Sequence, residues 1–214
     1  MDEHELISEG RFLTRRGFLT AVGAPVTGAL AAGRVAEAGR VKTVVIDAGH
    51  GGHDRGASYG LVYEKHLNLD VAFRLEAYLR KKGLRTVQTR SRDVFISLGQ
   101  RCRTANSNSR AVFVSIHFNW TWKKSSAGLE TFYYSGNAYS LGRHVHSRMI
   151  GALRGTDRGL KRRGFYVLRH TRIPAVLVEG GFISNTAERN RCLQPWYRES
   201  LAQAIGEAVL KVRT

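Results

Sequence analysis

Short apolar, β-branched runs alternate along this chain with segments of helical periodicity, and this alternation restricts the fold more than any other feature. The runs predict strands at residues 41–47, 84–89, 111–117, 128–134, 165–168 and 174–179. Apolar residues three or four positions apart predict helices at 65–82, 96–109, 140–153 and 195–212. Strands that alternate with helices form a largely parallel sheet with helices on both faces. We therefore expect an α/β fold.

The composition suits one domain with a single core. The chain has 214 residues, of which 43% are hydrophobic and 24% are charged, so wholesale disorder is not expected. No run of eighteen or more apolar residues occurs, so no membrane-spanning helix is expected.

The first 38 residues have the features of an export signal. Arg15 and Arg16 form an adjacent pair before a weakly apolar stretch at 18–32 that is rich in Ala and Gly. This pattern resembles a twin-arginine signal, and a small-x-small cleavage site follows at 36–38 or, alternatively, at 29–31. We expect 1–38 to be an export signal and linker, with an amphipathic or disordered arm as the alternative. The folded domain is then 39–214, acting in the periplasm or cell wall.

The charge balance is strongly positive, with 34 Lys+Arg against 17 Asp+Glu. Residues 1–38 hold four basic and five acidic residues, so the excess belongs to the predicted folded domain. Such an excess indicates a polyanionic partner, either nucleic acid or a cell wall. No recognised nucleic-acid-binding motif occurs, so no nucleic-acid partner is expected.

Two basic segments have open interpretations. One combines aromatic and basic residues that grip sugars or nucleic acid elsewhere, and a glycan is favoured here: Trp120, Trp122, Lys123 and Lys124. The other is either a solvated loop or a binder of wall carboxylates: Arg158, Lys161, Arg162 and Arg163.

The two cysteines, Cys102 and Cys192, are not in a C-x-x-C pair, which excludes a cysteine-rich zinc site. In an exported protein they could form a disulfide, but unpaired, partly buried thiols are the favoured interpretation. Five histidines are expected at the surface: His53, His66, His144, His146 and His170.

Polar residues stand where three predicted strands end. His50 follows the first strand, His117 ends the third, and Glu179 ends the last. Glu64 opens the first predicted helix, close in sequence to His50. Two histidines and one carboxylate are a standard set for a catalytic zinc, and a second carboxylate then serves as general base. Taken singly, each residue is equally well a turn, helix-start or strand-end polar residue.

In these and other segments the chain resembles the zinc-dependent N-acetylmuramoyl-L-alanine amidases often called amidase 3. The resemblance spans about 41–210 in family order. The matching segments are Val45-Ile46-Asp47-Ala48-Gly49-His50-Gly51-Gly52, Glu64-Lys65-His66-Leu67-Asn68-Leu69, Thr89-Arg90, Arg101 with Ala105-Asn106, Ser115-Ile116-His117-Phe118-Asn119, Gly128-Leu129-Glu130 and Val178-Glu179-Gly180-Gly181-Phe182-Ile183-Ser184-Asn185.

The resemblance implies a twisted, mixed six-stranded sheet and one zinc ion per chain. It implies His50, Glu64 and His117 as zinc ligands and Glu179 as the catalytic carboxylate. The implied reaction on peptidoglycan is hydrolysis of the amide bond between the lactyl group of N-acetylmuramic acid and L-alanine. A zinc peptidase of related fold, cutting within the stem peptide, is the alternative. Asn119, just past a ligand, is expected to contact substrate.

The chain departs from the family pattern at a few positions. Ala48 and Arg55 stand where the family usually has proline, and Ser109-Arg110 replaces the usual Ala-Asp. Some members insert a helical plug over the zinc site after the Gly-x-Glu strand. Here only residues 135–139 separate that strand from the next helix. We therefore expect a monomer that needs no obligatory activator.

Overall fold

The computed structural model describes residues 41–212, so the predicted export signal lies outside the described part of the chain. A six-stranded sheet forms the centre of this part, in the strand order β4-β1-β5-β8-β6-β7. The bounds are Thr43–Ala48 for β1, Arg85–Gln88 for β4, Ala111–Asn119 for β5, Leu129–Tyr133 for β6, Asp157–Arg162 for β7 and Ala175–Phe182 for β8.

Four strands of the sheet are parallel, and two run the other way. β4, β1, β5 and β8 pair in parallel, whereas β6 is antiparallel to β8 and β7 is parallel to β6. β1 and the first six residues of β5 are buried throughout, as expected for parallel strands covered on both faces. The expected mixed, largely parallel sheet of six strands is confirmed.

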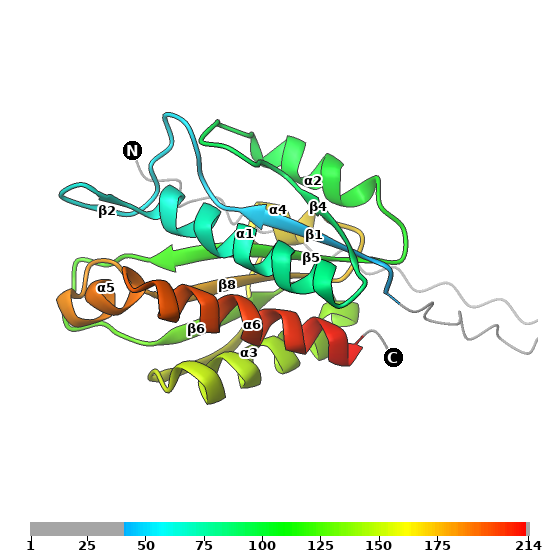
Figure 1. The fold of residues 1–214 in the computed structure, drawn as a ribbon. Coiled ribbons are helices and arrows are strands. Elements are labelled where there is room, and N and C mark those ends of the chain that lie inside the picture. The colour runs from blue at the N-terminus through cyan, green and yellow to red at the C-terminus, as the bar shows by residue number, and fades with distance from the viewer. Residues whose placement is uncertain (1–40, 213–214) are drawn as a thin grey trace, which may run out of the picture. The chain divides into compact units, whose positions relative to one another are not determined.

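Helices cover the two faces of the sheet unequally. Three long helices lie on one face: α1 (Glu64–Lys81), α3 (Tyr139–Leu153) and α6 (Pro195–Val212). Figure 1 shows α6 between α1 and α3. Two short helices, α2 (Leu98–Asn106) and α4 (Tyr166–Arg169), lie on the other face. The remaining elements are the hairpin β2 (Ser58–Tyr59) and β3 (Val62–Tyr63), the 3-10 turn η1 (Gly136–Ala138) and α5 (Thr186–Cys192).

Alternation along the strands sends neighbouring side chains into two separate cores. In β5, Val112, Val114 and Ile116 join the core under the three long helices. Phe113 joins the smaller core under α2 and α4. We call these faces the three-helix face and the two-helix face. His117 and Glu179 occupy positions that alternate onto the two-helix face.

One predicted strand is wrong. Residues 165–168 do not pair in the sheet, because Phe165 caps the short helix α4, which buries Val167 and Leu168. The sixth strand is instead β7. It lies in the basic segment for which the sequence allowed two interpretations, a solvated loop or a binder of wall carboxylates. β7 is an edge strand that pairs only with β6, and its residues are exposed or half-buried. Charged edge strands lack the apolar signal of a buried strand.

The burial and pairing of the cysteines and histidines test further predictions from the sequence. Cys102 and Cys192 are free and buried. They belong to the cores on opposite faces of the sheet, so they form no disulfide. His53, His66 and His170 are exposed as expected. The surface expectation is wrong for His146, because this α3 residue turns toward the sheet and hydrogen-bonds Thr131 and Asp157. No helix within residues 41–212 is long and apolar enough to span a membrane.

Candidate active site

The glycine-rich turn after β1 presents His50. His50 itself has a φ of 60°, a left-handed conformation that non-glycine residues rarely adopt. Gly49 passes directly against the ring of His117, since a Cβ at this position would lie 2.2 Å from Cε1 of that ring. A Cβ on Gly56 would lie 2.5 Å from Oε2 of Glu64. These glycines let the backbone approach the site where any side chain would displace it.

Glu64 enters the site as the first residue of α1, and it is 3% exposed. Its Oε2 accepts a hydrogen bond from the backbone N–H of Ala57 (2.8 Å). Its Oε1 accepts one from the backbone N–H of Phe118 (3.1 Å) and one from Nδ2 of Asn68 (3.1 Å). These donors come from α1, from β5 and from the loop before β2, and together they fix the orientation of the carboxylate.

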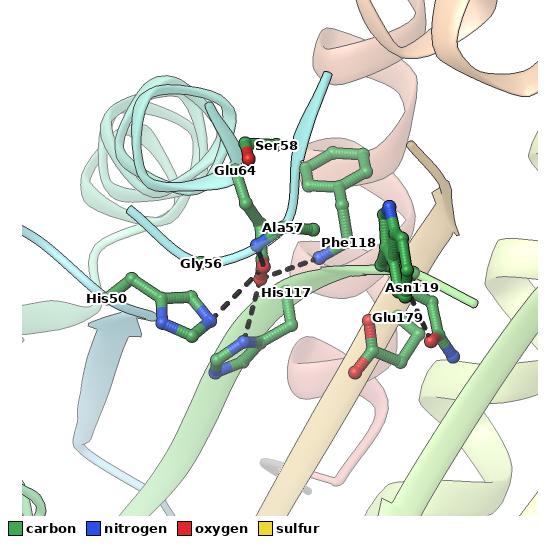
Figure 2. A pocket seen from close by; sticks show the side chains of 10 residues that line it. His50, Gly56, Ala57, Ser58, Glu64, His117, Phe118, Asn119 and Glu179 are labelled. Atoms are coloured by element: carbon green, nitrogen blue, oxygen red, sulfur yellow. Dashed lines mark hydrogen bonds and ion pairs between the residues drawn. The ribbon is translucent and has the colours of Figure 1, made fainter. Parts of the chain in front are cut away.

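His50 and His117 converge on this carboxylate. Nε2 of His50 lies 3.2 Å from Oε2 of Glu64, and Nδ1 of His117 lies 2.9 Å from Oε1. Figure 2 shows both rings pointing at Glu64, with Glu179 beyond His117 on the next strand. Burial alone would lower the pKa of His50, but hydrogen bonds and charge from Glu64 and Asp54 raise it to about 9. Burial opposes ionisation of Glu64, yet the two histidines hold its pKa well below the usual range.

The three residues fit a metal ion in type and spacing. One ligand atom from each of His50, Glu64 and His117 lies within 4.8 Å of the others. Nitrogen and oxygen ligands at the usual zinc distances lie roughly 3.4 Å apart in a tetrahedron, so small side-chain shifts would suffice. Nδ1 of His50 is bound to Oδ2 of Asp54 at 2.8 Å. A carboxylate in this position fixes the orientation of a ligating imidazole.

Glu179 lies beside the candidate metal-binding residues, opposite His117 in the parallel register of β5 and β8. Its Oε2 is buried and has no hydrogen-bond partner among the described residues. Burial, together with the negative charges of Glu64 and Glu130, raises its pKa well above the usual range for a glutamate. An unpartnered carboxyl group with a raised pKa next to a metal site can exchange protons with a reacting molecule.

Two buried arginines, whose roles the sequence did not reveal, hold the loop that carries His50. Arg90 donates to the backbone oxygens of Ala48, Gly49 and Lys65. Arg101 donates to the backbone oxygens of Ala48 and His50 and to the buried Asp47 carboxylate. Both belong to the segments that carried the family resemblance, but their targets are backbone atoms, which side-chain identity does not indicate.

Asn119 lies at the end of β5, next to the site. Its Nδ2 donates to Oε2 of Glu130 (2.9 Å), and its Oδ1 accepts from the backbone N–H of Trp120. Trp120 packs edge-on against Trp122, whose exposed fraction is 84%. Nζ of Lys124 lies 4.9 Å from the ring of Trp120. The aromatic and basic loop therefore borders the site.

Two clefts meet at the candidate metal site, and both are lined by His50, His117 and Glu179. One has a volume of about 470 Å³ and is also lined by Ala57, Ser58, Glu64, Asn119 and Trp120. The other, about 480 Å³, is largely apolar and is also lined by Phe95, Ile96, Leu98, Phe165, Tyr166 and Val167. The group of His50, His117 and Glu179 is therefore accessible from two sides.

Comparison with known proteins agrees with this geometry. The family model described as N-acetylmuramoyl-L-alanine amidase matches residues 44–211. The catalytic domain of CwlV, an N-acetylmuramoyl-L-alanine amidase from Bacillus (Paenibacillus) polymyxa var. colistinus, is 39% identical in sequence with a TM-score of 0.76. That match covers 80% of this chain and 99% of the CwlV chain.

Two further relatives differ in what surrounds the shared domain. The N-acetylmuramoyl-L-alanine amidase LytC of Bacillus subtilis (strain 168) is 36% identical over 173 residues, which are 79% of this chain but only 35% of LytC. The CwlD amidase of Clostridioides difficile, solved in complex with the GerS lipoprotein, is 29% identical with a TM-score of 0.74, covering 80% of this chain and 98% of CwlD. Since the family match runs from β1 into α6 and contains every residue of the site, the chain belongs to the N-acetylmuramoyl-L-alanine amidases and is an enzyme of that family.

Proposed function

We propose that this chain is a zinc-dependent amidase that hydrolyses the bond between the lactyl group of N-acetylmuramic acid and the L-alanine of the peptidoglycan stem peptide. His50, Glu64 and His117 would hold one zinc ion per chain. Glu179 is the catalytic carboxylate, and Asn119 contacts substrate. The observation that carries the proposal is the convergence of two imidazoles and one carboxylate beside an unpartnered buried carboxyl group.

The chain's own groups have distinct tasks in this reaction. Zinc bound at the cluster would polarise the amide carbonyl and acidify a water molecule. Glu179 takes a proton from the attacking water and then delivers it to the departing alanine nitrogen. Asp54 keeps the imidazole of His50 in one orientation. Asn68 and the backbone N–H groups of Ala57 and Phe118 hold the Glu64 carboxylate in place.

Metal content and amide cleavage test the proposal together. Purified full-length protein should contain one zinc per chain and should release stem peptides with free L-alanine amino termini from isolated peptidoglycan. His117→Ala should lose the metal during dialysis and lose cleavage with it. A His117→Ala protein that keeps one zinc per chain would show that the ligand assignment is wrong.

Product analysis separates the proposed reaction from that of a zinc peptidase of related fold. The amidase reaction leaves muramic acid with a free lactyl carboxylate and an intact stem peptide. A peptidase would leave the lactyl amide intact and shorten the stem. Mass spectrometry of the soluble products distinguishes these outcomes directly.

Residues 1–38 act, in this proposal, as a twin-arginine signal that brings the domain 39–214 to the periplasm or cell wall. The support is the Arg15-Arg16 pair and the location of the substrate in the wall. Replacing both arginines with lysine should retain the protein in the cytoplasm. Unchanged recovery of the double variant outside the inner membrane would rule out this signal.

We further propose a monomer that is active without a partner. The connection from β6 to α3 contains only residues 134–138, including the turn η1. An α-helix rises about 1.5 Å per residue, so this segment is too short to cross the site and return. Purified protein should digest peptidoglycan alone and elute as a monomer. The relative CwlD was solved in complex with the GerS lipoprotein, which is an example of the opposite arrangement. Activity that appears only after a partner is added would contradict the proposal for this chain.

A further inference from the structure

A cluster of two cations on one buried carboxylate lies next to the site. Oε1 of Glu130 accepts hydrogen bonds from Nε of Arg158 (2.9 Å) and from Nζ of Lys161 (2.6 Å). Its Oε2 accepts from Asn119. The side chain of Glu130 is 6% exposed, whereas those of Arg158 and Lys161 are 36% and 35% exposed. We call Glu130, Arg158 and Lys161 the β6–β7 cation cluster.

The cluster carries more positive charge than its own carboxylate requires. One cation is sufficient to neutralise Glu130, and the structure supplies two. Burial would raise the pKa of Glu130, but Lys161 and Arg158 lower it, so the group is ionised. The Arg158 guanidinium also lies 4.9 Å from the ring of Phe182. Its terminal nitrogens have no hydrogen-bond partner within residues 41–212, and they remain available to a planar anion.

The cluster lies on the Glu179 side of the metal-binding residues. Glu130 pairs with Glu179 in the register of β6 and β8, and directly opposite side chains have Cβ atoms about 5 Å apart. The strand order β1-β5-β8-β6-β7 puts His50 and His117 on one side of Glu179 and the cluster on the other.

This order gives the substrate a direction. In the proposed reaction Glu179 protonates the alanine nitrogen, so that nitrogen lies on the Glu179 side of the carbonyl held over the metal-binding residues. The stem peptide therefore extends toward β6 and β7. Two residues of extended peptide span about 7 Å, and adjacent strands are about 4.8 Å apart. The residue after alanine thus reaches the cluster.

We propose that Arg158 and Lys161 bind a carboxylate on the stem residue that follows L-alanine, so that the enzyme prefers stems in which this group is a free acid over stems in which it is an amide. This inference rests on the proposed amidase function, because the direction of the peptide follows from the role of Glu179. The inference gives two residues of the basic segment, Arg158 and Lys161, a role in binding the substrate. The neighbouring Arg162 has another role, since its guanidinium binds the backbone oxygen of Tyr134 and lies over that ring.

Two synthetic muramoyl dipeptides test the preference. They are identical except that the residue after L-alanine carries a free carboxylate in one and a carboxamide in the other. The full-length enzyme should cleave the acid with a kcat/KM at least about tenfold higher, as expected for a charge-assisted hydrogen bond. Arg158→Gln and Lys161→Gln should each bring this ratio toward one. Arg162→Gln, the same charge change on the same strand, should leave it unchanged.

Either cation alone still partners Glu130, so each single variant should fold, and its thermal unfolding midpoint checks this. The two product dipeptides carry either the free carboxylate or the carboxamide on the residue after L-alanine. Measuring their binding by NMR titration gives a readout that is independent of turnover. The acid should bind more tightly, and Arg158→Gln should abolish the difference. Equal binding of both products, or equal loss in Arg162→Gln, would overturn the inference. Failure to cleave either dipeptide would contradict the amidase proposal, while the titration would still decide the carboxylate site.

Discussion

The two faces of the sheet are packed to different depths. Within residues 41–212, the core of the three-helix face contains 29 buried hydrophobic residues, and the core of the two-helix face contains nine. The same strands serve both. Ile116 is fully buried under the long helices, and its neighbour His117 points to the other side as a candidate metal ligand. The larger core of the three-helix face thus holds the strands in register, while the two-helix face leaves their carboxyl ends open to substrate.

This difference predicts that substitutions on the two faces affect different properties. A change at the open end of the two-helix face should reduce metal binding or turnover without unfolding the protein. A change under the long helices should reduce stability without changing the turnover of the folded enzyme.

The largest effect is expected for Glu179→Gln. The variant keeps the shape of the side chain but cannot accept a proton, and a general base contributes about a hundredfold to ten-thousandfold in rate. Its unfolding midpoint should not fall, because Oε2 of Glu179 makes no hydrogen bond that would be lost. Peptide release from peptidoglycan and thermal unfolding measure both properties. Near-normal turnover would assign the base to another residue.

Leu75→Ala tests the three-helix face. Leu75 is fully buried in α1, and such a truncation costs about 2–5 kcal/mol of unfolding free energy. The same change at Leu168 in α4 is the matched variant on the two-helix face, where the neighbouring open cleft allows more relaxation. We expect the smaller loss there. Urea unfolding measures both, and an equal or larger loss for Leu168→Ala would contradict the difference in packing.

Asp54→Asn tests the support of the metal site. The amide can still approach Nδ1 of His50 but lacks the charge that fixes the imidazole, and comparable changes weaken metal affinity about 10- to 100-fold. Competition with a chelator measures the affinity. Asp93→Asn is the control, because Asp93 binds Lys65 and the backbone N–H of Gly52 without contacting His50. Unchanged affinity in Asp54→Asn would show that the loop alone orients the ring.

The sequence predicted the parts of the fold that apolar periodicity reports. The buried strands and the four predicted helices are present with shifts of a few residues at their ends. The edge strand β7 was not predicted because it has one partner strand and is otherwise exposed to solvent. Such a strand does not need apolar side chains, so its sequence shows no apolar pattern. The hairpin β2–β3 is too short for any periodicity, and α5 follows the last strand after only three residues.

The sequence predicted that His50, Glu64 and His117 come together, because few residue types can bind a metal, and the structure brings them within reach of one ion. Their roles come from the family resemblance and remain a proposal. The supporting groups were not predictable in the same way. Asp54 acts on His50 through local loop geometry, and Arg90 and Arg101 act on backbone oxygens. Many residues could be imagined in those roles, and only the folded chain shows which of them reach the loop.

The smallest effect is expected for Asp70→Asn, which tests whether charge contributes to the three-helix face. Asp70 of α1 binds Arg74 on the same helix and Arg198 of α6. Burial would raise the pKa of Asp70, but the two arginines lower it below its usual 3.8. A lowered folded-state pKa stabilises the protein above the unfolded-state pKa, and this contribution is lost as the pH falls through the folded-state value.

Asp70 is 37% exposed, so solvent screening limits its contribution to about 0.2–1 kcal/mol at neutral pH. The unfolding free energy of the variant should fall by that amount at pH 7 and low salt. The difference should shrink as the pH drops below 3.8, and it should nearly vanish in about 1 M salt, where the screening length is about 3 Å. Chemical unfolding of both proteins under the three conditions measures this. A loss as large as that of Leu75→Ala, or one that persists in high salt, would mean that ion pairs rather than apolar packing attach α6 to α1.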